Sequence, residues 1–358
     1  MTAVAPGDRV VVTGAAGFIG SAIARALSSR GAEVVAIVEP GTEPQAHVVL
    51  EGIAKETVTA DISDPGSLDG ALAGARFCFH VAARYAFWPK DPDLYYRANV
   101  EGSRNVVTSA WRSGVERVCY TSSVATIGLQ RTLAGGTASE DDYAHVEHLF
   151  GNYKRSKYVA EHEVLRLGAQ GAPVVLAHPT FPVGPGDRRP TPTGKLVLDF
   201  LNGKVPGYVD TTLNVVHVDD LAEGHVLALE RGRQGVSYVL GGENVSMQSL
   251  LAQLAELSGL RAPSLRVPSA LTLIAAFASD AIESGLLHRE PHVPLEGARM
   301  GATHMRFDDS RARDELGYVT RPTRSALADA VAYFLEQGYV TARRAGAMRT
   351  GAPAPTAG

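Results

Sequence analysis

Residues 10–20 read VVVTGAAGFIG: a β-branched run is followed at once by Gly14, Gly17 and Gly20 and by an apolar helical pattern. Glycines at this spacing allow a tight turn from strand to helix, a close approach of another group to the backbone, and close packing of helix on strand. The first turn of the helix also offers unpaired N–H groups and a positive dipole end to an anion. A tight turn alone would explain a lone glycine motif. The strand before it, the helix after it and a second strand ending near residue 38 favour a dinucleotide pyrophosphate at this turn.

Short β-branched runs alternate with helical patterns from residue 10 to residue 177. Strands are predicted over residues 10–13, 34–38, 57–60, 77–81, 117–121 and 174–177. Helices are predicted over residues 18–29, 65–73, 94–112 and 153–167. Runs that are apolar throughout and separated by helices belong to a parallel sheet covered on both faces. The fold class is therefore α/β, with a doubly wound parallel sheet of the Rossmann type and a smaller, mixed C-terminal lobe.

The regular alternation ends in a passage rich in Pro and Gly, HPTFPVGPGDRRPTPTG, which begins at residue 178. We assign residues 1–178 to a dinucleotide-binding domain and residues 179–340 to a substrate-binding lobe. The run LNVVHV, residues 213–218, reads as a strand that we expect to return to the first domain. Residues 341–358 have no apolar period and are expected to be a disordered tail.

Composition and charge narrow the class of protein. The chain has 358 residues, of which 45% are hydrophobic and 20% charged, an ordinary composition for a globular protein of more than one domain. A net charge of -4 and scattered Lys and Arg residues predict no nucleic-acid partner. Cys78 and Cys119 lie in apolar runs and are expected to be buried thiols in a reduced cytoplasm. The apolar stretch 270–281 is too short to span a bilayer, and the N-terminus has no leader pattern, so a cytoplasmic location is expected.

Residues at the ends of the predicted strands also suit a dinucleotide. Glu39 ends the second strand, where a carboxylate accepts hydrogen bonds from the adenosine ribose and repels a 2′-phosphate. NAD is therefore predicted in preference to NADP, which stays the alternative. Along the adenine and the rest of the cofactor we expect the residues that follow the third and fourth strands: Asp61, Ile62, Val81, Ala82 and Ala83.

The stretch GNYKRSK, residues 151–157, places Tyr153 four residues before Lys157 at the start of a predicted helix. Residues four apart share one helix face, although such pairs also occur by chance. The loop TSS, residues 121–123, follows the fifth strand, and the carboxyl ends of the strands face the ligand crevice in a doubly wound sheet. A hydroxyl, a phenol and an ammonium are thus expected to converge beside the nicotinamide.

These motifs resemble the extended branch of the short-chain dehydrogenase/reductase superfamily, the NAD-dependent epimerases and dehydratases. The resemblance rests on TGAAGFIG, DISDP, HVAA, RANVEG, YTSS, YKRSK, HPTFPVGPGD and HVDD, in the family's order, and covers about residues 8–340. It implies that Tyr153 gives or takes the proton, with Ser123, or next Ser122, on the substrate oxygen. It implies that Lys157 hydrogen-bonds the nicotinamide ribose and that Asn99 supports the active-site helix. It also implies a small-molecule substrate and a homodimer.

The same resemblance places the cofactor against Gly14, Gly17, Phe18, Ile19, Gly20, Lys157, Pro179 and Val183. An unperturbed phenol, with a pKa of about 10, is a weak base at neutral pH. Lys157 and the positive nicotinamide are expected to lower the pKa of Tyr153. His145 and His148 have no third ligand at a convincing spacing, so no metal site is predicted.

Within the branch, the chain is similar to hopanoid-associated sugar epimerases and to dihydroflavonol-reductase-like proteins, in WPKDPDLYYRANVEGSRNV, in YVLGGEN and in residues 190–232. Nucleotide-sugar enzymes of this branch generally keep an arginine before the strand that ends in His-Val and an asparagine after the sixth strand, and both grip the diphosphate. Here those places hold Leu213 and Phe181. Phosphate recognition depends on charge-assisted contacts, so a nucleotide sugar is disfavoured. The compensating cations would be Arg84, Arg188, Arg189 and Arg299.

Three functions are therefore carried forward. The first is an NAD(P)-dependent reductase or dehydrogenase that interconverts a carbonyl and an alcohol on a partly apolar molecule. Tyr85, Phe87, Trp88, Phe181 and residues 271–277 would wall its pocket, or would simply pack between the lobes. The second is a sugar epimerase that retains its NAD. The third is a dinucleotide-binding sensor without turnover, against which the intact Ser123, Tyr153 and Lys157 count.

Overall fold

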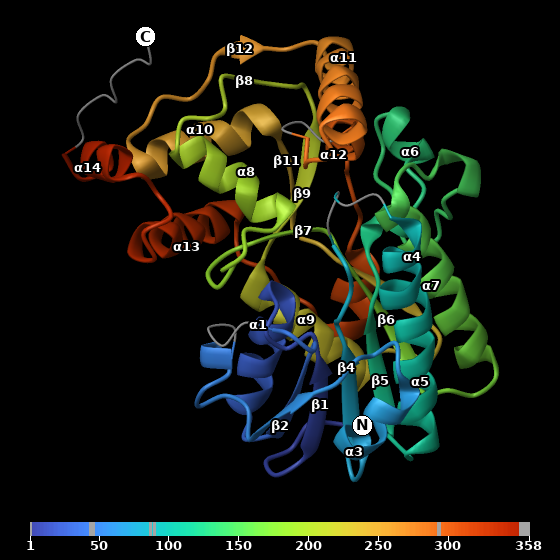
Figure 1. Cartoon of the computed structure of the whole chain (residues 1–358). Coiled ribbons are helices and arrows are strands. Elements are labelled where there is room, and N and C mark those ends of the chain that lie inside the picture. Colours follow the sequence, from blue (N-terminus) through green and yellow to red (C-terminus); the bar gives the residue numbers. More distant parts are fainter. Residues whose placement is uncertain (1, 43–46, 86–87, 89–90, 292–294, 351–358) are drawn as a thin grey trace.

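The computed structural model describes residues 2–42, 47–85, 88, 91–291 and 295–350. Within these residues the largest sheet has seven strands, all parallel, in the order β10-β6-β5-β4-β1-β2-β3 (Figure 1). Its strands are β1 (Arg9–Thr13), β2 (Glu33–Val38), β3 (Glu56–Thr59), β4 (Phe77–His80), β5 (Arg117–Thr121), β6 (Val174–Pro179) and β10 (Ser237–Leu240). The predicted doubly wound α/β class is confirmed.

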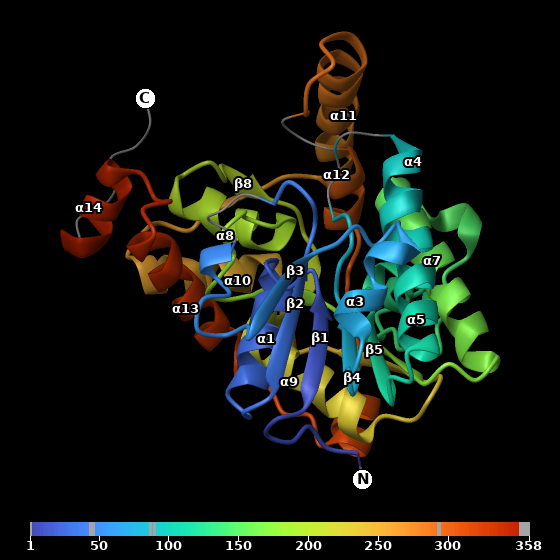
Figure 2. The ribbon, with the colours of Figure 1, turned by 60° about the horizontal axis from the view of Figure 1, so that its bottom comes forward.

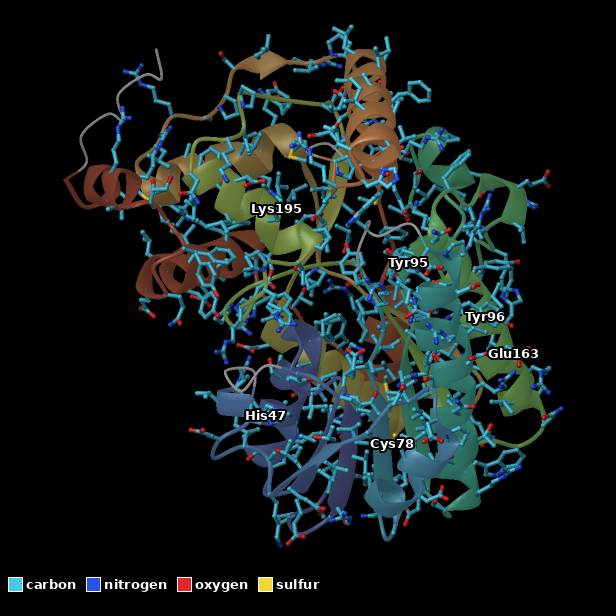
Figure 3. All side chains as sticks on the ribbon, in the orientation of Figure 1. His47, Cys78, Tyr95, Tyr96, Glu163 and Lys195 are labelled. Atoms are coloured by element: carbon cyan, nitrogen blue, oxygen red, sulfur yellow. The ribbon has the colours of Figure 1, made fainter. Side chains whose placement is uncertain are left out.

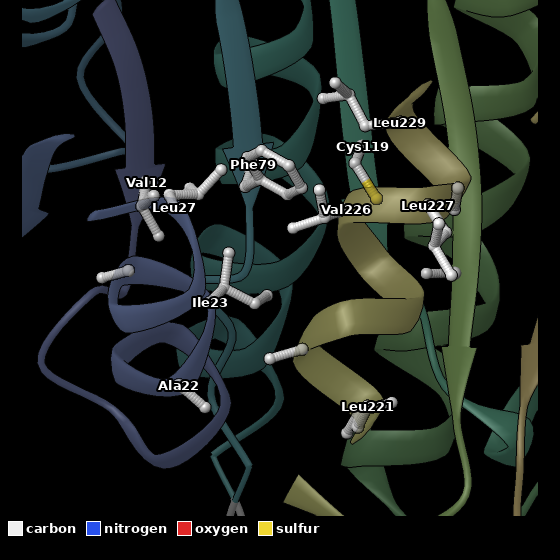
Figure 4. Close-up of a cluster of buried hydrophobic side chains, with 14 of the residues drawn as sticks. Val12, Ala22, Ile23, Leu27, Phe79, Cys119, Leu221, Val226, Leu227 and Leu229 are labelled. Atoms are coloured by element: carbon white, nitrogen blue, oxygen red, sulfur yellow. The ribbon is translucent and has the colours of Figure 1, made fainter. Parts of the chain in front are cut away.

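One face of this sheet is covered by α1 (Phe18–Ser28) and α9 (Val218–Arg231). Figure 4 shows Ile23 of α1 and Val226 of α9 pointing toward each other beside Phe79 of β4. All three side chains are fully buried. The N-terminal and later parts of the chain are therefore joined in one apolar core on this face.

The opposite face is covered by α5 (Gly102–Arg112) and α7 (Asn152–Ala169), with α3 (Asp69–Leu72) beside them (Figure 2). Val11 enters this core, whereas its neighbours Val10 and Val12 enter the other. This alternation explains why β1 is apolar throughout, because both of its faces are buried.

The second lobe is built on a smaller sheet with the order β11-β9-β7. Its strands are β7 (Phe181–Val183), β9 (Thr212–His217) and β11 (Glu243–Ser246), and its core includes α8 (Pro192–Leu201), α10 (Met247–Ser258) and α13 (Thr323–Glu336). The run 213–218, expected to return to the first sheet, lies here instead, since β9 pairs with β7 and β11. The strand that returns to the first sheet is β10, which pairs with β6. Both runs are short and apolar, so their composition does not say which sheet they join.

The remaining elements connect these layers and extend the second lobe. They are η1 (Pro65–Ser67), α4 (Pro92–Tyr95), η2 (Tyr96–Glu101), η3 (Val124–Thr126), α6 (Gln130–Leu133), η4 (Val146–His148), β8 (Gly207–Tyr208), β12 (Leu265–Arg266), α11 (Ser269–Ser279), η5 (Asp280–Leu286), α12 (Leu295–Gly301), η6 (Ala312–Leu316) and α14 (Ala342–Thr350). The helix α14 corrects the expectation that the tail from residue 341 is disordered, because its first part is helical. Residues 351–358 lie outside the described part of the chain.

No helix in the described part combines the length and apolar character needed to cross a membrane.

Candidate active site

The glycine turn links β1 to α1 at the carboxyl edge of the sheet. Gly14 has a φ of +65°, and a Cβ there would lie 2.8 Å from the Cα of Ala82. A Cβ at Gly20 would collide with the carbonyl of Gly14. Gly17 is the N-cap of α1 and no side chain caps the helix. The turn thus leaves the first-turn N–H groups to an outside acceptor and keeps its surface free of side chains, which fits a pyrophosphate.

Thr13 binds the loop that follows β4 to the glycine turn through hydrogen bonds. Its Oγ1 accepts hydrogen bonds from the backbone N–H groups of Val81 and Ala82, both at 3.1 Å, and lies 2.8 Å from His80 Nδ1. Burial, and next the charge of Lys157, lower the pKa of His80 to about 3. A neutral His80 therefore belongs to the scaffold, and Thr13 is a supporting residue that the sequence analysis missed.

Ser123, Tyr153 and Lys157 line one cavity, as the sequence predicts. Ser123 is the N-cap of η3, and its Oγ accepts a hydrogen bond from the N–H of Ala125 at 3.1 Å. Tyr153 lies in the first turn of α7, with a relative exposure of 7%, and Ser123 lies close enough to affect its phenol. The serine and the phenol therefore come together from two different elements.

Lys157 is anchored one helical turn further along α7. It is 2% exposed, and its Nζ donates to the carbonyl of Thr121 at 2.8 Å and to Tyr120 Oη at 3.1 Å. It also lies 4.7 Å from the centre of the Tyr120 ring. Lys157 therefore holds the end of β5 against α7.

Burial is the largest influence on the pKa values of Tyr153 and Lys157. It raises the pKa of Tyr153 to about 12, although Ser123 opposes this. Burial also lowers the pKa of Lys157 to about 8, against the charge of Glu161, which raises it. The sequence analysis expected the pKa of Tyr153 to be lowered by Lys157. In the chain itself the direction is the opposite, because desolvation of the phenolate outweighs the effect of Ser123, and the charge of Glu296 raises the pKa further.

Asn99 supports the active-site helix, as the resemblance implied. Its Nδ2 donates to Ser156 Oγ at 2.8 Å, and Ser156 Oγ donates to the carbonyl of Tyr153 at 2.8 Å. Its Oδ1 accepts from the N–H of Arg84 at 2.7 Å. Asn99 is fully buried in η2, and its described contacts are to protein groups, which gives it a structural role.

A buried carboxylate, Glu161, lies on α7 one turn after Lys157. Its Oε2 accepts hydrogen bonds from Ser122 Oγ, from Thr126 Oγ1 at 2.7 Å and from His178 Nε2 at 2.9 Å. Burial alone would raise the pKa of Glu161, but His178 and the hydroxyl donors lower it to about 2. Ser122, the second candidate for the catalytic serine, is thus committed to Glu161. The sequence analysis missed this cluster, and its one local signal was an acid four residues after Lys157.

The cavity has a volume of about 950 Å³ and runs from the glycine turn into the second lobe. Of the predicted cofactor residues, it is lined by Gly14, Gly17, Phe18, Ile19, Gly20, Glu39, Val81, Ala82, Ala83, Lys157 and Pro179. Asp61, Ile62 and Val183 do not line it. Asp61 accepts hydrogen bonds from Ser63, and Val183 is fully buried in the core of the second lobe. No group of three or more His, Cys, Asp or Glu side chains suited to a metal occurs in the described part of the chain.

The second lobe contributes mainly apolar side chains to the cavity: Phe181, Pro182, Leu196, Leu213, Met247, Met305 and Phe307. Tyr85 adds a ring whose centre lies 4.7 Å from that of Tyr153. Phe87 lies outside the described residues. Leu271 and Phe277, expected on the pocket wall, are instead 57% and 66% exposed on the outside of α11, because that helix projects from the lobe (Figure 2).

Comparison with known proteins agrees with the fold and shows the family. Residues 10–241 match the NAD dependent epimerase/dehydratase family. A protein of Synechocystis sp. named "Putative dihydroflavonol 4-reductase" is 42% identical over 341 residues, which are 94% of this chain and 97% of that protein. Sterol demethylase protein B of Methylococcus capsulatus is 33% identical over 331 residues, 92% of this chain and 99% of that protein. The crystal structure of gox2253 has a TM-score of 0.82 and 41% identity, and covers 93% of this chain and 100% of its own.

The family match covers more than half of the chain and includes the glycine turn, Ser123, Tyr153 and Lys157. The two curated relatives cover nearly the whole chain, second lobe included. This chain therefore belongs to the NAD-dependent epimerase/dehydratase family, within the extended short-chain dehydrogenases/reductases, and is an NAD(P)-dependent enzyme.

Proposed function

We propose that this enzyme is a reductase or dehydrogenase that interconverts a carbonyl and an alcohol on a partly apolar small molecule. The observation that carries the proposal is the apolar lining of the cavity where the second lobe meets Tyr153. Leu213 and Phe181, at the two places where a nucleotide-sugar enzyme would keep Arg and Asn, both line this cavity. An apolar wall favours apolar substrate surface, whereas a diphosphate placed against Leu213 and Phe181 would lose hydration without gaining a charged partner from those two positions.

Two polar residues of the second lobe that line the cavity, Asn214 and Asp187, are engaged within the protein. Asn214 lines the cavity, but its Nδ2 donates to Asn244 Oδ1 at 2.9 Å and its Oδ1 accepts from the N–H of Gly242 at 2.8 Å. Asp187 also lines the cavity, and both of its oxygens accept from the N–H of Thr191. These hydrogen bonds leave the apolar side chains as the main recognition surface.

In this proposal the glycine turn holds the pyrophosphate, Glu39 the adenosine ribose and Lys157 the nicotinamide ribose. Bound NAD(H) supplies or accepts the hydride. Ser123 positions the substrate oxygen, and Tyr153 gives it a proton during reduction or takes one during oxidation. With a pKa raised by burial, Tyr153 is protonated at neutral pH and suited to the acid role in the chain itself. The positive charge of an oxidised nicotinamide would favour the phenolate and so support the base role.

Glu39 supports NAD over NADP. Its side chain is exposed and lines the cavity beyond the end of β2. A 2′-phosphate there would meet a carboxylate instead of a cation. The names of the two curated relatives, with a dihydroflavonol in one and a sterol in the other, agree with a substrate that has substantial apolar surface.

An NAD-retaining sugar epimerase is the second candidate, because Arg188 and Arg189 line the cavity and could meet a diphosphate. The other two cations lie elsewhere: Arg84 packs on the Tyr95 ring and Arg299 on the Phe150 ring. The family includes epimerases, so this candidate needs a direct test.

A thermal-shift panel with saturating NAD separates the two candidates. Apolar ketones and alcohols, such as a flavanone and a steroid ketone, should raise Tm, through binding to the native state, more than UDP-glucose or GDP-mannose at equal concentration. Nucleotide sugars should bind no tighter than the millimolar range, about 4 kcal/mol. Micromolar binding of a nucleotide sugar that is lost in Arg188→Ala would reverse the ranking and make the epimerase the better assignment.

A further inference from the structure

Glu161 joins three segments of the chain that each carry part of the site. Its Oε2 receives hydrogen bonds from the loop after β5, through Ser122 and Thr126, and from the end of β6, through His178. Its own helix, α7, carries Tyr153 and Lys157. Ser122 directly precedes Ser123, and His178 directly precedes the cavity residue Pro179. One carboxylate thus ties the loop that carries Ser123 and the end of β6 to the helix that carries Tyr153 and Lys157.

We propose that Glu161 is a positioning residue, whose buried carboxylate fixes the Ser123 loop, the Tyr153 helix and the end of β6 in one arrangement and places a negative charge one helical turn from Lys157. This inference rests on the proposed use of Ser123, Tyr153 and Lys157. The relative exposures of the four hydrogen-bonded residues are 8% or less, so water cannot readily replace a lost partner. A buried carboxylate is costly unless donors surround it, and three donors converge on one oxygen here.

The charges around Lys157 make its protonation sensitive to Glu161. Besides Glu161 on its own helix, Lys157 faces Tyr120 from β5, His80 from β4 and Tyr153 from the previous turn. None of those three neighbours is an anion at neutral pH: burial lowers the pKa of His80 and raises the pKa values of both tyrosines.

Glu161 is the anion among these groups that favours the ammonium form, and it raises the pKa of Lys157 against the effect of burial. On its far side Glu161 faces His178, whose Nε2 lies 2.9 Å from Glu161 Oε2. Neutralising Glu161 should therefore lower the pKa of Lys157 below its present value of about 8.

NAD⁺ binding measured by calorimetry from pH 6 to pH 10 tests this without any substrate. The wild-type affinity should fall as the pH rises through the pKa of Lys157, since a charge-assisted hydrogen bond to the ribose is lost. In Glu161→Gln the midpoint of this fall should move to lower pH by roughly one unit. If neutral Lys157 binds tenfold more weakly, the variant binds NAD⁺ about two- to threefold more weakly near pH 7.5.

Glu163→Gln is the matched control. Glu163 lies on the same helix, points outward in Figure 3 and pairs with Arg166 at 2.9 Å in solvent, so its neutralisation should leave the midpoint unchanged. Equal midpoints in wild type, Glu161→Gln and Glu163→Gln would overturn the inference. Wild-type protein that binds no NAD⁺ would instead overturn the proposed function, so the two failures are distinguishable.

Ser122→Ala separates the positioning effect of Glu161 from the effect of its negative charge. It also provides a second test if Glu161→Gln does not fold. It removes one of the three donors but leaves the carboxylate, so the NAD⁺ midpoint should stay at the wild-type value. With any accepted substrate, kcat should fall roughly tenfold while KM changes little, because the Ser123 loop loses its anchor. A shifted midpoint, or a kcat equal to that of wild type, contradicts the positioning role.

Discussion

Replacing Gly14 by Ala should lower both the stability of the protein and its affinity for NAD⁺, and the structure allows the size of each effect to be estimated. Gly14 has a φ of +65°, in the left-handed region where an L side chain costs about 1–2 kcal/mol. The new Cβ would lie 2.8 Å from the Cα and 2.9 Å from the N of Ala82, so the Ala82 backbone must retreat to about 3.4 Å or more. That retreat strains the hydrogen bond from the N–H of Ala82 to Thr13, a further loss of about 1 kcal/mol.

The expected total is a loss of roughly 2–4 kcal/mol in the free energy of unfolding. NAD⁺ affinity should fall at least tenfold, about 1.4 kcal/mol, because Gly14 and Ala82 both line the cofactor end of the cavity. Urea unfolding followed by circular dichroism gives the first quantity, and calorimetric titration with NAD⁺ gives the second.

Gly74→Ala is a close control for backbone strain. Gly74 has nearly the same φ, +68°, but a Cβ there would have no atom within 4 Å. This variant should lose about 1–2 kcal/mol of stability and keep the NAD⁺ affinity of wild type. If Gly14→Ala lost no more stability than Gly74→Ala and bound NAD⁺ equally well, the steric argument for the glycine turn would be refuted.

Two further substitutions test the catalytic and cofactor assignments. Tyr153→Phe keeps the buried ring and removes the proton donor, so kcat should fall on the order of 10²-fold or more with little change in NAD⁺ affinity. The control is Tyr158→Phe, on the same helix with its ring against His162, which should keep full activity. A Tyr153→Phe variant with nearly full activity would rule out the acid/base role. Wild-type protein should bind NAD(H) at least tenfold tighter than NADP(H), about 1.4 kcal/mol. Glu39→Arg should narrow or invert that preference, and equal binding by wild type would show that Glu39 does not read the ribose.

The sequence alone was sufficient to locate six of the seven strands of the central sheet and to bring the candidate site residues together, because these signals are local. A parallel strand buried on both faces is mainly apolar, so β1, β2, β4, β5 and β6 could be recognised from their apolar runs. The edge strand β3 is mostly exposed and was recognised from its β-branched residues instead. Tyr153 and Lys157 are four residues apart on one helix, and the glycine turn follows β1 directly. Ser123 follows β5, and the carboxyl ends of parallel strands lie at one edge of the sheet. The order of elements therefore places Ser123 near the glycine turn and the Tyr153 helix.

The tertiary structure decided the features that depend on contacts between distant residues. Whether β9 or β10 joins the large sheet depends on which partner strands are within reach, and both runs are equally apolar. The pKa of Tyr153 follows from how completely the surrounding elements remove water, which no spacing encodes. Glu161 meets His178 across 17 residues and Ser122 across 39. A lone acid on a helix is usually solvated, and here its burial is decided by two other strands that close over it.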